Sequence, residues 1–234
     1  MTSNPESDKL AELPWPGPIE PREHVSEAIR RECTRDLAGR RGLGTAQRVA
    51  LSLLVSAGVF GLLLYHGVAT RPESAWRAAL FGALGWSVVH IGLLVIGLAR
   101  PPGRRGPRSL RWALVMGVPL AFLVYLGFAA SGAVPFSEFI RGEHADWATK
   151  CGLFALFSGA LASGATLLVW RGTDPLTPGL SGALAGVTGG LCGAYAMGCA
   201  CSATEFWHVL FSHGLIVVAL GTAGWLIGRR WLSP

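Results

Sequence analysis

The chain has 234 residues, of which 51% are hydrophobic and only 15% are charged. Soluble domains carry about 25% charged residues, so this composition excludes that class and favours an integral membrane protein. The 32 glycines lie inside long apolar runs without a fixed period, which excludes collagen-like and low-complexity chains. The net charge of +6 lies in short runs beside apolar segments, where it sets topology and does not indicate nucleic-acid binding.

Six apolar stretches are each long enough to cross a hydrocarbon core of about 30 Å as a helix. Lipid offers no partner for backbone N–H and C=O groups, so a spanning segment of this kind must be helical. We therefore predict an all-α integral membrane bundle of six transmembrane helices. The predicted spans are Ala46–His66, Arg77–Ala99, Trp112–Ala130, Thr149–Trp170, Gly179–Cys199 and Trp207–Gly228.

Basic residues are divided unequally between the two sets of connecting segments. Counted close to the predicted span ends, from Arg35 onward, twelve arginines lie at the start of span one, after spans two and four, and after span six, whereas the opposite loops hold four basic residues. The positive-inside rule therefore predicts that both termini are cytoplasmic. Tryptophans at predicted span ends are typical of interfacial aromatic belts; they are Trp76, Trp112, Trp147, Trp170, Trp207 and Trp231.

The predicted organisation is a cytoplasmic segment over residues 1–45, a transmembrane domain over 46–228 and a cytoplasmic tail over 229–234. Residues 1–20 are rich in proline and are expected to be extended or disordered. From Arg22 to Arg41 one apolar stripe recurs every four residues, which predicts a short amphipathic helix. The stripe consists of Val25, Ile29, Cys33 and Leu37.

Such a helix is too short to fold stably alone. It could lie on the inner leaflet, dock on cytoplasmic loops or enter the groove of a soluble partner, and the simplest alternative is a solvated lead-in to span one. A segment of this length cannot form a catalytic domain, so any function here is binding. Span five carries Gly182, Gly186 and Gly190 at four-residue spacing, which predicts a tightly packed central helix.

Three of the five cysteines converge on the predicted outer side. Cys151 opens span four, Cys199 closes span five and Cys201 follows it. In an oxidising compartment a disulfide from Cys151 to either of the other two is expected, which leaves one thiol for exchange. The simplest alternative is that these are small buried residues at helix ends.

A metal ion is the competing interpretation for this end of the bundle. The thiolate and imidazole donors would come from Cys151, Cys199, Cys201 and His208, with His144 as a further candidate. His208 and His213 are five residues apart, about 140° around an α-helix, so we expect that they do not face one ion together.

His90 lies near the middle of span two, where a polar side chain usually faces the bundle interior. It could relay a proton, or it could be a neutral histidine bonded to a neighbouring helix. The span interiors otherwise lack acidic and basic residues, which argues against an ion-coupled transporter. A small-molecule carrier or channel and a membrane haem or redox protein remain as alternatives.

A family pattern extends from about Trp147 to the C-terminus. It comprises Cys151, the turn Arg171–Pro178, the glycine-rich helix Gly182–Gly193, the segment Gly193–Cys199 and the sequence Phe206-Trp207-His208. With the six-span layout and the short polar N-terminus, this pattern resembles the NrsF-type ("negative regulator of sigma F") membrane anti-sigma factors of bacteria.

The resemblance implies a regulatory protein of the bacterial inner membrane and not an enzyme. Residues 1–45 would hold an extracytoplasmic-function sigma factor, with no direct contact to nucleic acid. The two outer-face cysteines of the family would map onto Cys151 and Cys199, with Cys201 as a rival for the second. An oxidant or thiophilic metal acting there would release the sigma factor. No cofactor is implied beyond a possible metal ion at this cluster.

Overall fold

The computed structural model describes residues 27, 31, 43–68, 73–99, 107–132, 134–141, 143–171, 173–174 and 176–232. The chain divides into two compact units, Met1–Leu43 and Gly44–Pro234, and the second unit is considered by itself here. Six of its helices are long and apolar enough to cross a membrane, and no strand occurs among the described residues. The predicted all-α fold with six spans is therefore confirmed.

The elements of the described residues are α-helices and two π-helical segments. In chain order they are α3 (Thr45–Val68), α4 (Glu73–Gly92) with its π-helical continuation η1 (Leu93–Leu98), α5 (Arg108–Ala129), α6 (Phe136–Phe139), α7 (Glu143–Val169), α8 (Pro178–Ala200), α9 (Phe206–Val209), the π-helical η3 (Leu210–Gly214) and α10 (Leu215–Trp231).

Three helices begin four or more residues earlier than predicted. α4 begins at Glu73 and not at Arg77, α5 at Arg108 and not at Trp112, and α7 at Glu143 and not at Thr149. The reason is that hydropathy detects only the apolar part of a helix, whereas the backbone continues as a helix through polar residues at the membrane surface. The short helix α6 and the two π-helical segments were not predicted.

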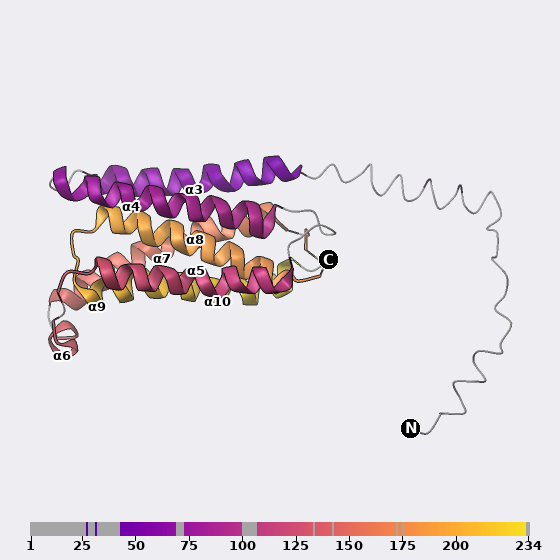
Figure 1. Cartoon of the computed structure of the whole chain (residues 1–234). Helices are drawn as coiled ribbons and strands as arrows, with labels where there is room; N and C mark the ends of the chain where they lie inside the picture. The colour runs from indigo at the N-terminus through magenta and orange to yellow at the C-terminus, as the bar shows by residue number, and fades with distance from the viewer. Residues whose placement is uncertain are drawn as a thin grey trace, which may run out of the picture. The chain divides into compact units, whose positions relative to one another are not determined.

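The helices of the bundle run between two opposite ends (Figure 1). α3 and α5 begin, and α10 finishes, at one end, which we call the Arg111 end. α7 and the final helical segment begin, and α8 finishes, at the other end, which we call the Cys201 end.

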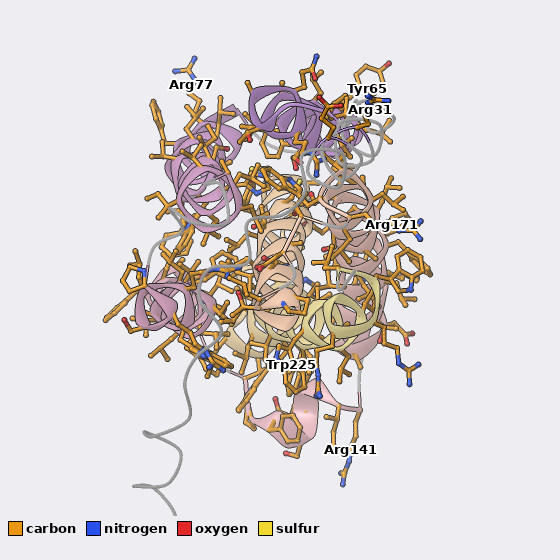
Figure 2. All side chains as sticks on the ribbon, turned by 90° about the vertical axis from the view of Figure 1, so that its right-hand side faces the viewer. Arg31, Tyr65, Arg77, Arg141, Arg171 and Trp225 are labelled. Atoms are coloured by element: carbon orange, nitrogen blue, oxygen red, sulfur yellow. The ribbon has the colours of Figure 1, made fainter. Side chains whose placement is uncertain are left out.

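α8 is the central helix of the bundle. Of its span 83% is buried, compared with 17–44% for the other five. Figure 2 looks along the bundle and shows α8 enclosed by the remaining helices. Because lipid tails are as apolar as leucine, close van der Waals packing has to hold such a helix in place.

The glycine stripe of α8 faces α10. A Cβ atom on Gly182 would overlap the backbone of Gly224, and one on Gly186 would overlap the carbonyl group of Leu220. A Cβ on Gly190 would stand 2.8 Å from the Cα of Val217. The backbones therefore touch along three successive turns, and no residue larger than glycine fits at these positions.

A second stripe of the same helix faces α7. Gly189 lies against Ser163, and Gly193 lies against the carbonyl group of Ala155 and the backbone of Gly159. One face of α8 thus contacts α10 and another contacts α7 at backbone distance. Together the two contacts fix α8 in depth and rotation.

We predict that Gly186→Ala destabilises the bundle by about 1–3 kcal/mol, because the added methyl group has to push α8 away from α10. Each kcal/mol lost lowers the unfolding midpoint by about 2–4 °C, so thermal unfolding in detergent would detect this loss. Gly164→Ala is the matched control, since a Cβ there meets nothing within 4 Å and alanine favours the helix. Equal midpoints for the two variants would contradict the packing argument.

Candidate functional site

Two thiols and two imidazoles gather at the Cys201 end. Cys151 lies in α7, Cys201 follows α8 and His208 lies in α9. The Sγ atoms of the two cysteines are 3.5 Å apart, and Cys201 Sγ is 3.1 Å from His208 Nε2. All three side chains are at most 5% exposed, so the cluster is closed to bulk water.

The end of α8 places Cys201 in this cluster. The N–H group of Cys201 donates to the carbonyl oxygen of Met197 at 2.7 Å, and the residue itself is extended with φ −82° and ψ 132°. The chain therefore leaves the helix axis at this residue and crosses toward α7. Backbone bonds from Ser131 to Thr204 and from Phe206 to Gly132 hold the connecting loop against the loop after α5.

A π-helical turn brings the second histidine to the same side. Within η3 the N–H group of Leu215 donates to the carbonyl oxygen of Leu210, five residues back. Such a turn is wider than an α-helical one, so residues five apart lie above one another. The ring centroids of His208 and His213 are 5.8 Å apart, whereas the donor group that could surround one ion contains His208 and not His213.

Hydrogen bonds set the protonation states in the cluster. The bond from Cys151 lowers the pKa of the Cys201 thiol, and the bonds with His208 and His213 lower it further, while burial opposes them. Nδ1 of His213 lies 3.1 Å from the carbonyl oxygen of Ala194, so in the neutral ring Nδ1 carries the proton and Nε2 keeps its lone pair. Cys201 is thus the nucleophilic thiol of the pair.

This arrangement supports two kinds of chemistry. A movement of about 1.5 Å would bring the two sulfur atoms to the length of a disulfide bond. Alternatively, the donor atoms of Cys151, Cys201 and His208 lie within 4.8 Å of one another, and thiolate with imidazole suits Zn²⁺ and softer ions. Disulfide formation starts from the Cys201 thiolate, metal binding needs both thiols deprotonated, and both reactions would tie α7 to the end of α8.

The other predicted sensor residues lie elsewhere. Cys199 is buried in the apolar core with Ala194, Tyr195 and Val217, and it does not belong to the donor group around Cys201. Of the two possible partners of Cys151, the structure therefore brings Cys201 near it. The side chain of His144 lies outside the described part of the chain.

His90 faces the bundle interior from α4. Its Nε2 atom is 3.0 Å from Ser56 Oγ of α3, and the side chain is 2% exposed. The thiol of Cys192, from α8, donates to the Ser56 carbonyl oxygen at 3.4 Å. These contacts join three helices in the middle of the bundle.

The predicted partner-binding stripe falls outside the described residues. This applies to Val25, Ile29, Cys33 and Leu37. Of residues 1–42 the structure describes Glu27 and Arg31, which are helical and form an exposed ion pair at 3.1 Å.

Sequence reasoning missed a buried ion pair at the Arg111 end. Arg111, counted above among the loop charges, is 3% exposed in the first turn of α5, and its guanidinium is 3.1 Å from the carboxylate of Asp174. The same guanidinium donates to the hydroxyl oxygens of Thr177 and Ser181. One signal was available: after residue 45, Asp174 is the only acidic residue in the segments predicted to be cytoplasmic.

This ion pair fastens the beginning of α8. Asp174 accepts hydrogen bonds from the N–H group of Thr177 and from Ser181 Oγ, so it orders the first turn of the helix. Arg111 adds α5 to the same group of atoms. A charged pair in so dry a position is retained only while every partner is present.

The family model for NrsF, described as negative regulator of sigma F, matches residues 30–233. No curated protein and no solved structure matches the chain.

We predict that Arg111→Met costs about 3–5 kcal/mol of stability, because it leaves the Asp174 carboxylate buried without its cation. The double variant Arg111→Met/Asp174→Asn removes both charges and is expected to recover a large part of the loss. Thermal unfolding in detergent measures both. Equal midpoints for the single and double variants would contradict the pairing.

We predict that dilute hydrogen peroxide links Cys151 to Cys201. The Cys201 thiolate is oxidised to a sulfenic acid, and the Cys151 thiol then displaces water to form the disulfide. Peptide mass spectrometry should find the bridge in the wild type and in Cys199→Ser, and lose it in Cys201→Ser. A bridge from Cys151 to Cys199 in the wild type would refute this assignment.

The rate of this oxidation also has an expected pH dependence. Because the pKa of Cys201 is lowered, its thiolate persists as the pH falls below the ordinary thiol value of about 8.5. The substitution His208→Ala removes one of the contacts that lower the pKa of Cys201. The pKa of Cys201 therefore rises, and Cys201 is oxidised more slowly at pH 6 than in the wild type. The two proteins should converge above pH 9, where either thiol is ionised.

Proposed function

The chain belongs to the NrsF family of negative regulators of sigma F, and from this premise we propose that it is an anti-sigma factor for an extracytoplasmic-function sigma factor. Its place would be the inner membrane of a bacterium, with both termini in the cytoplasm. The family match over residues 30–233 is the observation that carries the proposal. The six membrane-spanning helices are consistent with it, because they can hold a captured partner at the membrane.

The partner-binding element of this proposal is the segment 1–45. Its apolar stripe, Val25 to Leu37, suits the groove of a soluble protein, as amphipathic helices commonly bind. The exposed pair Glu27 and Arg31 lies on the other side of that helical pattern. The family match begins at residue 30 and so includes the second half of the stripe. A sigma factor held here would be kept from RNA polymerase.

The signal-receiving element would be the cluster around Cys201, on the outer side of the membrane. An oxidant would join Cys151 to Cys201, and a thiophilic metal ion would bind both thiols and His208. Either event removes the hydrogen bond between the thiols and pulls the end of α8 toward α7. A buried thiol with an ordinary pKa is inert. The oxidant or metal ion would therefore react with Cys201, whose pKa is lowered.

α8 would carry this change across the membrane. Cys201 follows its last turn, and Asp174, Thr177 and Ser181 surround its first turn. Because α8 touches α7 and α10 at backbone distance, it moves as a rod and cannot absorb a displacement by side-chain rearrangement. A 100-fold loss of affinity for the sigma factor needs about 2.7 kcal/mol of coupling between the two ends.

We predict that the N-terminal segment determines which protein co-purifies. The tagged chain is solubilised gently from its native host, and the bound proteins are identified by mass spectrometry. A sigma factor is expected with the full chain and should be lost when residues 1–45 are deleted. Its absence from the full-length sample would contradict the proposal.

Substitutions on the two faces of the helix make the matched comparison. Replacing Val25 and Ile29 by serine removes half of the apolar stripe and should reduce the recovered sigma factor at least tenfold. Replacing Glu27 and Arg31 by serine changes the same number of residues on the charged face and should leave recovery within about twofold. Equal losses from both pairs would argue against a helix that binds through its apolar stripe.

A further inference from the structure

A cavity of about 540 Å³ lies beside the thiol cluster and takes no part in the mechanism above. α4 and α5 form its walls, α8 forms its floor, and residues 202–204 close it toward the Cys201 end. Its volume falls within the range of about 300–1,000 Å³ that is usual for small-molecule sites. It is therefore large enough for a ligand and small enough to be selective.

Four aromatic side chains line the cavity: Trp86, Phe122, Tyr125 and Tyr195. Trp86 meets Phe122 edge-on with ring centroids 4.9 Å apart, and it meets Tyr125 at 5.5 Å. Tyr195 lies on the floor formed by α8. Such rings favour flat aromatic guests, which they contact by stacking and by edge-to-face packing.

Small residues keep the cavity open. The lining includes Gly82, Ala83 and Ala129 on the walls and Gly198 on the floor. A Cβ atom on Gly198 would meet nothing within 4 Å, whereas the packing glycines of the same helix leave no room for one. This glycine is therefore not required by helix packing, and the space beside it is unfilled.

Apart from the two tyrosine hydroxyls and the indole N–H of Trp86, the polar groups of the lining are uncharged and lie at the loop end, where the Thr204 hydroxyl also contacts Ser131 Oγ at 2.6 Å. Ser202 and Thr204 belong to the closing loop, and His213 and Cys199 stand beside it. The lining contains no Asp, Glu, Lys or Arg, so it offers nothing to neutralise a charged guest. The guest that fits is neutral, with an apolar ring system at one end and an oxygen substituent at the other.

We propose that this cavity binds a neutral, flat aromatic molecule of the naphthol or quinone class, which reaches it from the bilayer. Its rings pack against Trp86 and Tyr125, and its oxygen atom meets the hydroxyl groups of Ser202 and Thr204. Binding at this site is independent of the proposed control of a sigma factor. His213 borders the cavity and also stands 5.8 Å from His208, so an occupied cavity and the thiol cluster share one side chain.

The test uses the full chain in lipid nanodiscs and 1-naphthol as the probe. Binding is followed by naphthol fluorescence during a protein titration, with empty nanodiscs subtracted to remove partition into lipid. Gly198→Leu fills the cavity from its floor and is expected to weaken binding at least tenfold. Gly164→Leu, at a position that is equally open but outside the lining, should bind within about twofold of the wild type.

A second variant addresses the aromatic wall without filling the cavity. Trp86→Leu keeps an apolar side chain but removes the ring, and an aromatic contact of about 0.5–1.5 kcal/mol corresponds to a roughly two- to tenfold weaker affinity. Thermal unfolding verifies that each variant is folded before its affinity is compared. Saturable binding that Gly198→Leu abolishes and Gly164→Leu retains supports the proposal. Non-saturable uptake equal to that of empty nanodiscs, or equal affinity in both glycine variants, overturns it.

Discussion

The backbone contact of α8 with α7 and α10 is the constraint on which the rest of the structure depends. In lipid the hydrophobic effect does not press helices together, so only close surfaces and polar bonds hold them. Glycines on two faces of α8 allow its neighbours to approach to backbone distance. The remaining helices, α3, α4 and α5, then pack around this three-helix centre through larger side chains such as Phe122 and Leu184.

This constraint gives α8 two fixed ends with different chemistry. At its beginning, the ion pair of Arg111 with Asp174 gathers α5, the preceding turn and the first helical residues into one bonded group. At its other end, the Cys201 thiol contacts Cys151 of α7 and His208 of α9. The tight middle makes these two ends mechanically dependent on each other, because a rod that is packed on both sides transmits a shift along its axis.

Sequence patterns predicted the parts of this structure that follow from solvation. The six spans are apolar because lipid surrounds them, and the glycine spacing of Gly182, Gly186 and Gly190 is visible without coordinates. The proximity of Cys151 to the end of span five follows from topology alone. The sequence did not reveal the hydrogen-bonding pattern of the backbone. The π-helical turn after Val209 moves His213 to the side of His208, and no residue type marks such a turn. Arg111 was misplaced for a similar reason, since a charge count does not distinguish a surface arginine from a buried one.

The contrast between the two ends of α8 supports the proposal that a signal would enter at the thiols. A buried guanidinium and carboxylate hold each other by charge and hydrogen bonding, and opening that pair would leave an unpaired ion in a dry site. Thiols, in contrast, change their bonding partners in one chemical step, and the disulfide or metal-bound state is as compact as the reduced one. In the proposed mechanism the Cys201 end would therefore change its bonds, while the bonds of the Arg111 end stay closed. A displacement that begins at the thiols would then reach α5 through the intact ion pair, because that pair makes α5 follow the beginning of α8.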